Sequence, residues 1–304
     1  MNAYSEALNW IYNLRGGVID LRLDRMERAL SVLGHPERQF PALHIAGTNG
    51  KGSTAAILHR TLTLAGYRTG LYTSPHLVSF TERIRIGDQE ITPDEVVELV
   101  CEIRERIIAA GVSLTFFEIV TVMAFIYFAR RRIDVGVIEV GMGGRLDATN
   151  LVRPIVTMVT TISKDHEAFL GSDLLSIGRE KAGIFKPGIP VVCGQMLPEI
   201  AALMKQLAEE KRSSSYFLGS DFGIFLKNES FFDYKGVIRN VLDIGIALRG
   251  AHQRANAGVA LAALELAAGR FPVDERTIRQ ALGTVIWPCR FEVLRERPWV
   301  ILDG

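Results

Sequence analysis

The sequence has few cysteines, almost no net charge and no long apolar run. Its three cysteines, Cys101, Cys193 and Cys289, are spread widely over 304 residues, which gives neither a CxxC metal motif nor a disulfide framework. So sparse a count is typical of a reducing compartment. The net charge of +1 disfavours a general nucleic-acid binder, which would carry a basic excess. We therefore expect no nucleic-acid partner.

Targeting and membrane segments are also missing from the sequence. The first residues lack a basic segment followed by an apolar run, so no signal peptide is predicted. The most apolar stretch, 116–129, contains Glu118 and is shorter than the ~20 residues of a spanning helix. This stretch predicts a buried helix instead. We expect a cytoplasmic protein that is monomeric and does not bind membranes.

What is present is the composition of a globular protein and an alternation of strand and helix patterns. Hydrophobic residues make up 48% of the chain and charged residues 23%, which excludes a disordered chain. Apolar or β-branched runs at 42–46, 135–140 and 155–161 are typical of buried parallel strands. Helical patterns lie between such runs, and Thr92 to Glu95 has the form of a capping box at a helix start. The sequence predicts an α/β domain with a mainly parallel sheet flanked by helices.

Two segments depart from this alternation. Residues 216–250 show short strands and glycine turns, which predict a small antiparallel β flap. Residues 299–304 form an apolar strand for which the sequence shows no partner. We expect that strand to lie unpaired.

A glycine-rich segment, Gly47-Thr48-Asn49-Gly50-Lys51-Gly52-Ser53-Thr54, follows the strand pattern 42–46 and opens a helix pattern. Backbone N–H groups in such a loop converge on phosphate oxygens, and the helix N-terminus adds positive potential. Lys51 is expected to reach the terminal phosphates, and Ser53 or Thr54 a magnesium ion. Because Gly52 separates Lys51 from Ser53, the segment departs from the general Walker pattern. A glycine turn without a ligand therefore stays the alternative.

The phosphate loop and a series of further motifs resemble the folylpolyglutamate synthase and dihydrofolate synthase family of the Mur ligase superfamily. The resemblance covers nearly the whole chain, in the same order. The matching segments are 47–53, 73–77, 116–125, 139–150, 165–171, 180–184, 252–257 and 287–292. The resemblance implies ATP, Mg²⁺, a pteroate-type acid and L-glutamate as ligands. It also implies that ATP converts the acid to an acyl phosphate, which the glutamate amine attacks.

The family pattern implies a role for each matching residue. It gives Lys51, Lys181 and His166 a catalytic role, with a carbamate on Lys181. It places the nucleotide on residues 47–53 (Gly47, Thr48, Asn49, Gly50, Lys51, Gly52 and Ser53), Asn256, Arg290 and Asp303, and less surely on Gln253. It places magnesium on Ser53, Ser74, Glu139, His166 and Lys181, and the pteroate-type acid on His76, Phe117, Arg145 and Asp147.

Each of these residues also has an ordinary structural interpretation. From the residues alone, Glu139 is equally well an ion-paired carboxylate, and Ser74 a turn-stabilising hydroxyl before Pro75. His166 as a lone histidine is more often structural, and Lys181 in a charged stretch is typical of a surface lysine. Most aromatic residues near Phe117 are expected in the core.

The sequence also departs from the family pattern. Cys289 replaces a usual glycine before Arg290, and Ser163-Lys164 replaces a small or apolar pair before Asp165. The family pattern continues beyond residue 304, so we expect residues 1–296 to form the ATP-binding domain and 297–304 to begin a hinge. On that basis the chain is expected to be an ATPase domain that does not ligate. The alternatives are a nucleotide- or folate-binding fragment without turnover and another Mur-type amide ligase.

Overall fold

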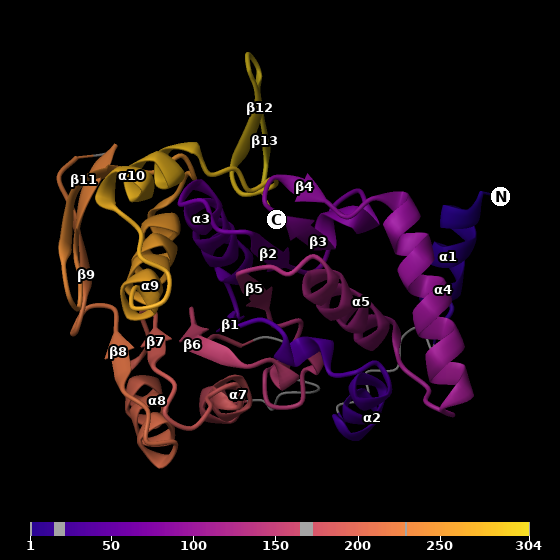
Figure 1. Ribbon diagram of the computed structural model, residues 1–304. Helices are drawn as coiled ribbons and strands as arrows, with labels where there is room; N and C mark the ends of the chain where they lie inside the picture. The colour runs from indigo at the N-terminus through magenta and orange to yellow at the C-terminus, as the bar shows by residue number, and fades with distance from the viewer. Residues whose placement is uncertain (1, 15–21, 165–172, 229, 304) are drawn as a thin grey trace.

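A single twisted sheet forms the centre of the molecule. The computed structural model describes residues 2–14, 22–164, 173–228 and 230–303. The strands of the sheet are β1 (Ala42–Ala46), β2 (Thr69–Tyr72), β3 (Ile84–Ile86), β4 (Gln89–Glu90), β5 (Val135–Glu139), β6 (Pro154–Val159), β7 (Val191–Cys193) and β8 (Ser215–Phe217). They run in the order β4-β3-β2-β5-β1-β6-β7-β8 (Figure 1). The pairs from β2 to β8 are parallel, and β3 and β4 add an antiparallel edge.

Helices cover both faces of this sheet, as Figure 1 shows. On one face lie α3 (Lys51–Leu64), α9 (Ala251–Ala267) and α10 (Glu275–Thr284). The other face carries α1 (Ala3–Tyr12), α2 (Asp24–Val32), α4 (Pro93–Ala109) and α5 (Phe116–Arg130) beside β2, and α7 (Leu174–Ala182) and α8 (Pro198–Glu210) beside β7. Because both faces are covered, strands β1, β2, β5 and β7 are buried along their whole length. The predicted α/β fold is confirmed.

Helix starts follow the capping chemistry of the sequence. The predicted capping box at Thr92 is present, because its hydroxyl accepts the Glu95 N–H while the Glu95 carboxylate accepts the Thr92 N–H at 2.8 Å. Thr115 and Glu118 form a second box at the start of α5. Glu118 also accepts Arg25 Nε of α2 at 2.8 Å. This explains the acidic residue inside the apolar stretch, which is a buried helix as predicted. In the part of the chain that the structure describes, no helix is long and apolar enough to cross a membrane.

The predicted antiparallel flap is present as a separate three-stranded sheet. It consists of β9 (Gly223–Leu226), β10 (Phe231–Lys235) and β11 (Asn240–Gly245), with β10 in the middle. One part of the expected flap is different, because β8 pairs parallel with β7 and extends the main sheet. The short edge strands β3 and β4 were not predicted from the sequence, since three and two residues are too few to show a pattern.

The expectation of an unpaired C-terminal strand is wrong. Strand β13 (Trp299–Leu302) pairs antiparallel with β12 (Glu292–Glu296) in a hairpin that projects from the body in Figure 1. β12 contains three charged residues and lies half-exposed or exposed, so no apolar pattern marks it in the sequence. The predicted domain boundary between residues 296 and 297 falls at the end of β12 and stays a prediction.

A buried carboxylate attaches the flap to α9. Glu265, which is 4% exposed, accepts hydrogen bonds from the Tyr234 hydroxyl at 3.1 Å and from the backbone N–H groups of Val237 and Arg239 at 2.9 and 3.0 Å. A Cβ on Gly236 would lie 2.3 Å from Glu265 Oε1, so only glycine fits there. The turn between β10 and β11 is therefore built around this one side chain.

Replacing this carboxylate should destabilise the protein. Glu265→Ala leaves a buried hydroxyl and the N–H groups of residues 237–239 without this acceptor, so we expect a loss of about 3 kcal/mol in the free energy of unfolding, measured by urea denaturation. Glu209→Ala, at an exposed position of α8, is the matched control and should change it by less than about 0.5 kcal/mol. A loss below about 1 kcal/mol for Glu265→Ala would contradict the anchoring role.

Candidate active site

The predicted site residues lie in loops that leave the same edge of the sheet. β1 is followed by residues 47–50, β2 by 73–79, β5 by 140–147 and β6 by 160–164. The carboxyl ends of parallel strands meet at one edge, and ligands of such sheets bind in the crevice there. The chain order of the strands therefore brings these loops together.

The glycines of the phosphate loop are required by close packing against three other segments. Gly50 caps α3 with a φ of 85°. An added Cβ would lie 2.0 Å from Thr160 Oγ1 at Gly47, 2.3 Å from Asn256 Oδ1 at Gly50, and 3.0 Å from the Trp287 ring at Gly52. The loop therefore touches the end of β6, the start of α9 and the segment before β12 at the same time.

Two threonines after β6 hold the phosphate loop in place. Thr160 Oγ1 donates to the Asn49 carbonyl at 2.6 Å, and the Thr161 carbonyl accepts the Thr48 N–H at 2.8 Å. Asn49 N–H donates to Thr161 Oγ1 at 3.0 Å. The side chain of Lys51 folds back over this loop, because its Nζ donates to the carbonyls of Gly47 and Thr48 at 2.9 and 3.0 Å. A phosphate oxygen offers Lys51 a charged acceptor in place of these neutral ones.

Glu139 brings a buried carboxylate to the phosphate loop. It ends β5, is 5% exposed, and accepts the Ser74 N–H at 3.0 Å. Burial raises its pKa to about 7, against the opposing effects of the Lys51 ammonium, the Ser74 N–H and the Arg290 guanidinium. These residues come from four separate segments, so the structure brings together four of the residues that the sequence assigned to phosphate and metal.

The donor atoms of the residues assigned to the metal suit magnesium. The Glu139 carboxylate and the hydroxyls of Ser74 and Ser53 are hard oxygen donors, which Mg²⁺ prefers, and Mg²⁺ takes few protein ligands beside phosphate and water. Among the described residues, no group of three or more His, Cys, Asp or Glu side chains is placed so that it could hold a metal ion. The predicted ligand His166 lies outside the described residues, so its role stays a prediction.

Lys181 is buried, not a surface residue. It lies in the last turn of α7 and is only 2% exposed. The loop after β5 packs against that turn, because a Cβ on Gly144 would lie 2.9 Å from the Lys181 carbonyl and the Arg145 N–H donates to the Glu180 carbonyl at 2.8 Å. The ordinary interpretation of Lys181 as a surface lysine is therefore wrong.

Two of the residues expected on the acid side, His76 and Phe117, lie beside the sheet edge. His76 Nδ1 accepts Arg83 Nε at 2.6 Å, and burial, followed by the Arg83 charge, lowers the pKa of His76. The Phe117 ring covers Gly141, whose added Cβ would lie 2.4 Å from the ring. Phe117 is half-buried, so part of its ring contributes to the core as expected.

The other two, Arg145 and Asp147, are engaged within the protein. Arg145 Nη2 pairs with Glu180 Oε1 at 2.9 Å. Asp147 is buried and accepts the Met142 N–H at 2.9 Å, together with the N–H and hydroxyl of Thr149 at 2.9 and 2.5 Å. Burial raises the pKa of Asp147, whereas these hydrogen bonds lower it. Asp147 thus holds its own loop, and substrate contact by either residue stays a prediction.

The residues assigned to the nucleotide base and ribose approach from the C-terminal third of the chain. Asn256 is buried against Gly50 and donates from Nδ2 to Gln253 Oε1 at 3.1 Å. Arg290 follows Cys289, whose φ of 55° is in the left-handed region. That conformation explains why a glycine is usual there. Asp303 Oδ1 accepts the Phe291 N–H at 3.2 Å and so lies within the hairpin.

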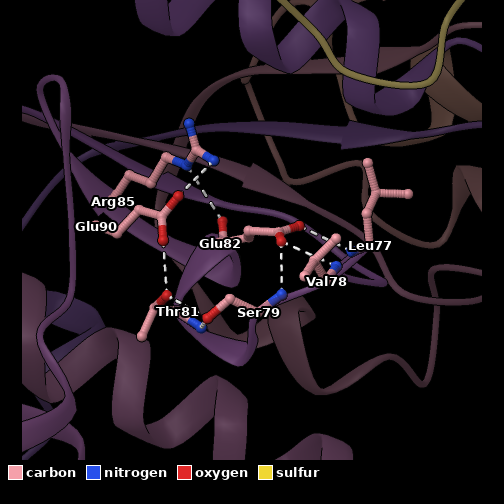
Figure 2. A network of polar contacts seen from close by, with 7 residues as sticks. All are labelled: Leu77, Val78, Ser79, Thr81, Glu82, Arg85 and Glu90. Atoms are coloured by element: carbon pink, nitrogen blue, oxygen red, sulfur yellow. Dashed lines mark hydrogen bonds and ion pairs between the residues drawn. The ribbon is translucent and has the colours of Figure 1, made fainter.

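The loop that carries Ser74 and His76 is held by a carboxylate that the sequence did not single out. Glu82 accepts the consecutive backbone N–H groups of Leu77, Val78 and Ser79 at 2.8, 2.9 and 2.6 Å (Figure 2). Burial opposes ionisation of Glu82, but these hydrogen bonds outweigh it and lower its pKa.

A neighbouring pair in Figure 2 supports the same turn. Thr81 Oγ1 donates to Glu90 Oε2 at 2.6 Å, and Arg85 Nη2 donates to Glu90 Oε1 at 2.8 Å.

The site therefore depends on residues that the sequence analysis gave no role, above all Glu82, Thr160 and Trp287. The capping pattern from Ser79 to Glu82 was the available indication for Glu82.

Comparisons with known proteins identify the family of the chain and agree with its fold. Residues 45–264 match the Mur ligase middle domain family. A curated dihydrofolate synthase/folylpolyglutamate synthase of Bacillus subtilis is 36% identical, over 99% of this chain and 73% of its own length. A structure titled FPGS-AMPPCP-folate complex superposes with a TM-score of 0.94 at 33% identity, covering 100% of this chain and 77% of that one. Escherichia coli FolC in complex with DHPP and ADP gives a TM-score of 0.90 at 36% identity, over 99% and 70%.

Removing the charge of Glu82 should loosen the loop that it holds. Glu82→Gln leaves one carbonyl oxygen for three N–H groups, so hydrogen exchange at the amides of residues 77–79 should accelerate by about tenfold. Glu90→Gln is the matched control, because Glu90 bonds Thr81 and Arg85 but none of these amides. In the parent, the amides of residues 77–79 should be fully protected above the ordinary pKa of a glutamate carboxyl. This protection should be lost as the pH falls through the lowered pKa of Glu82. Equal exchange in both variants would contradict this role.

Proposed function

This chain belongs to the folylpolyglutamate synthase and dihydrofolate synthase family of the Mur ligases. On that premise we propose that it joins L-glutamate to the carboxylate of a pteroate-type acid with ATP, and the expected ATPase domain that does not ligate is the alternative. The observation that carries the proposal is the meeting of the phosphate loop with Glu139 and Ser74 at one sheet edge. The complexes of similar proteins with a nucleotide, and in two of them with folate or DHPP, support both ligand classes.

The reaction has two steps in which the protein mainly positions groups and stabilises charge. An oxygen of the acid's carboxylate attacks the γ-phosphorus of ATP, and ADP leaves, which gives an acyl phosphate. The glutamate amine then attacks the acyl carbon, loses a proton and expels inorganic phosphate, which leaves an amide. Positioning and electrostatic stabilisation are the main contributions an enzyme makes to phosphoryl transfer.

The phosphate loop supplies the nucleotide side of this reaction. The N–H groups at the start of α3, together with the positive end of the helix dipole, bind the phosphates. Lys51 exchanges the carbonyls of Gly47 and Thr48 for phosphate oxygens. Asn256 and Gln253 face the base, while Arg290 and Asp303 contact phosphate and ribose.

Glu139, Ser74 and Ser53 would hold magnesium, with His166 as a further ligand. A bound magnesium ion neutralises phosphate charge when ATP is present. Lys181, as a carbamate, would add an anionic oxygen ligand near the γ-phosphate. The inward position of Lys181, which is only 2% exposed, supports this role over that of a surface lysine.

On the acid side, we propose that His76 and Phe117 contact the pteroate-type acid from the loop after β2 and the start of α5. Arg145 and Asp147 were also predicted there. Their bonds to Glu180 and Thr149 favour a supporting role in which they shape the loop next to the acid.

The proposal is tested by product formation. The protein is incubated with ATP, L-glutamate and either dihydropteroate or tetrahydrofolate, and the glutamylated product is measured by mass spectrometry. Lys51→Ala removes a charge-assisted contact worth about 1.5–3 kcal/mol, so calorimetry should show ATP binding weakened by about 10- to 150-fold. Arg68→Ala, an exposed arginine remote from the phosphate loop in the sequence, is the control.

The outcomes separate the possible functions. Product from the parent and weak binding by Lys51→Ala support the ligase. Nucleotide binding without product would favour the expected ATPase domain or binding fragment that does not ligate. A third incubation with a cell-wall precursor acid tests the remaining alternative, because product formed only there would favour another Mur-type ligase. Equal ATP affinity in Lys51→Ala and the parent would contradict the phosphate-loop assignment.

Glu139 gives an independent prediction about magnesium. Since Glu139 and the nucleotide phosphates share the ion, Mg²⁺ should tighten ATP binding in the parent, and this tightening should be lost in Glu139→Gln. Calorimetric titration of ATP with and without Mg²⁺ measures the difference. A full magnesium effect in Glu139→Gln would exclude Glu139 as a ligand, and Glu180→Gln, on α7, controls for the loss of a nearby negative charge.

A further inference from the structure

A histidine lies in the middle of the central strand, at a position where apolar side chains are usual. His44 of β1 is fully buried, with Leu43 and Ile45 on either side. Burial lowers its pKa to about 3, and the Lys186 charge acts in the same direction. The ring is therefore neutral at physiological pH, with one protonated nitrogen. Because burying an unpaired polar atom is unfavourable, a histidine here needs an explanation beyond filling space.

The hydrogen bonds around His44 determine which nitrogen carries the proton. Thr149 Oγ1 lies 2.9 Å from His44 Nε2 and 2.5 Å from Asp147 Oδ1. Asp147 also accepts two backbone N–H groups, and the Thr149 hydroxyl donates its proton to Asp147 Oδ1. The single Thr149 hydroxyl proton must therefore point to Asp147, so Thr149 accepts from His44 Nε2–H. His44 Nδ1, which has no partner among the described residues, is the unprotonated nitrogen.

This chain of hydrogen bonds ends on the loop between two predicted site residues. Asp147 Oδ2 accepts the N–H of Met142, three residues after Glu139. At its far side the same loop contacts the last turn of α7, where a Cβ on Gly144 would lie 2.9 Å from the Lys181 carbonyl. A change in Asp147 therefore acts on the loop that follows Glu139 in the chain and packs against the turn that contains Lys181.

We propose that His44 is a positioning residue, which donates Nε2–H to Thr149 and thereby fixes Asp147 and the backbone of the loop between Glu139 and Lys181. The proposal rests on the proposed function, because its effect on catalysis requires that Glu139 and Lys181 take part in ligation. A residue that only fills the core would be replaceable by an apolar side chain of similar size. A positioning residue at this place requires an N–H donor where the histidine ring carries Nε2.

Two amide side chains distinguish these roles. Glutamine can place an N–H near the position of Nε2, whereas asparagine places it near Nδ1. With both substrates present, His44→Gln should keep kcat/KM for the pteroate-type acid within about threefold of the parent. His44→Asn and His44→Leu should lower it by about 10- to 100-fold, as loss of outer-shell partners of a metal site commonly does. The Kd for ADP without magnesium, measured by calorimetry, should stay unchanged in all three.

Thr149, which lies between His44 and Asp147 in the chain of hydrogen bonds, supplies the second test. Thr149→Val should lower kcat/KM as much as His44→Asn does, and Thr149→Ser should restore it. The double variant His44→Asn/Thr149→Val should be no worse than either single variant, because both act through Asp147. Full activity in His44→Leu, or multiplying losses in the double variant, would overturn the proposal.

A readout without turnover separates this proposal from the proposed function. In nitrogen-15 NMR of histidine-labelled parent protein, His44 should be the Nε2–H tautomer, and the Nδ1–H tautomer would refute the proposal. Exchange of the Met142 amide should accelerate at least tenfold in Thr149→Val and His44→Asn but not in His44→Gln. If the parent forms no product, the ligase function fails while these measurements still decide the role of His44. Thermal unfolding of each variant ensures that only folded protein is compared.

Discussion

The close contact of the phosphate loop with three other segments is the constraint on which the candidate site depends. Gly47, Gly50 and Gly52 have no room for a side chain, because Thr160, Asn256 and Trp287 occupy that space. These partners follow β6, open α9 and precede β12, so the loop has its shape only when the sheet and the C-terminal third of the chain are in place. The same contacts bring the groups assigned to base and phosphate next to the loop, which is why the nucleotide site needs the whole fold.

The burial of polar side chains is the second feature of the region around the candidate site. Glu139, Asp147, Lys181 and His44 are each at most 5% exposed. Asp147 recovers its lost hydration through several donors, and the effect of burial on Glu139 is evident in its pKa of about 7. A carboxylate that burial makes hard to ionise gains more from a cation than an exposed one does. The structure thus provides a stronger reason than the sequence for placing magnesium at Glu139.

The sequence predicted features that depend on local pattern and missed those that depend on contact. The strands β1 and β5 and the helix α3 lie where the apolar runs and the glycine loop placed them, because period and capping are local properties. β8 joined the main sheet, since the sequence of a strand does not show which strand it pairs with. β12 paired with β13 although its charged and exposed residues show no apolar pattern. Family motifs located Glu139 and Lys51, whereas Glu82 and Thr160 act by holding backbone groups, and a sequence does not show which amides a carboxylate will accept.

The polar groups of the site therefore divide by how much of their bonding capacity the protein already uses. Asp147 accepts three hydrogen bonds inside its loop, and Glu82 accepts three consecutive N–H groups, so each holds a loop and has little left for a ligand. Lys51 donates to two neutral carbonyls, which a phosphate displaces because a charged acceptor binds an ammonium more strongly. Glu139, with one N–H bond from Ser74, keeps an oxygen for a cation. Groups with remaining capacity lie at the phosphate loop, and groups without it fix the loops around them, which is the arrangement that a preorganised site requires.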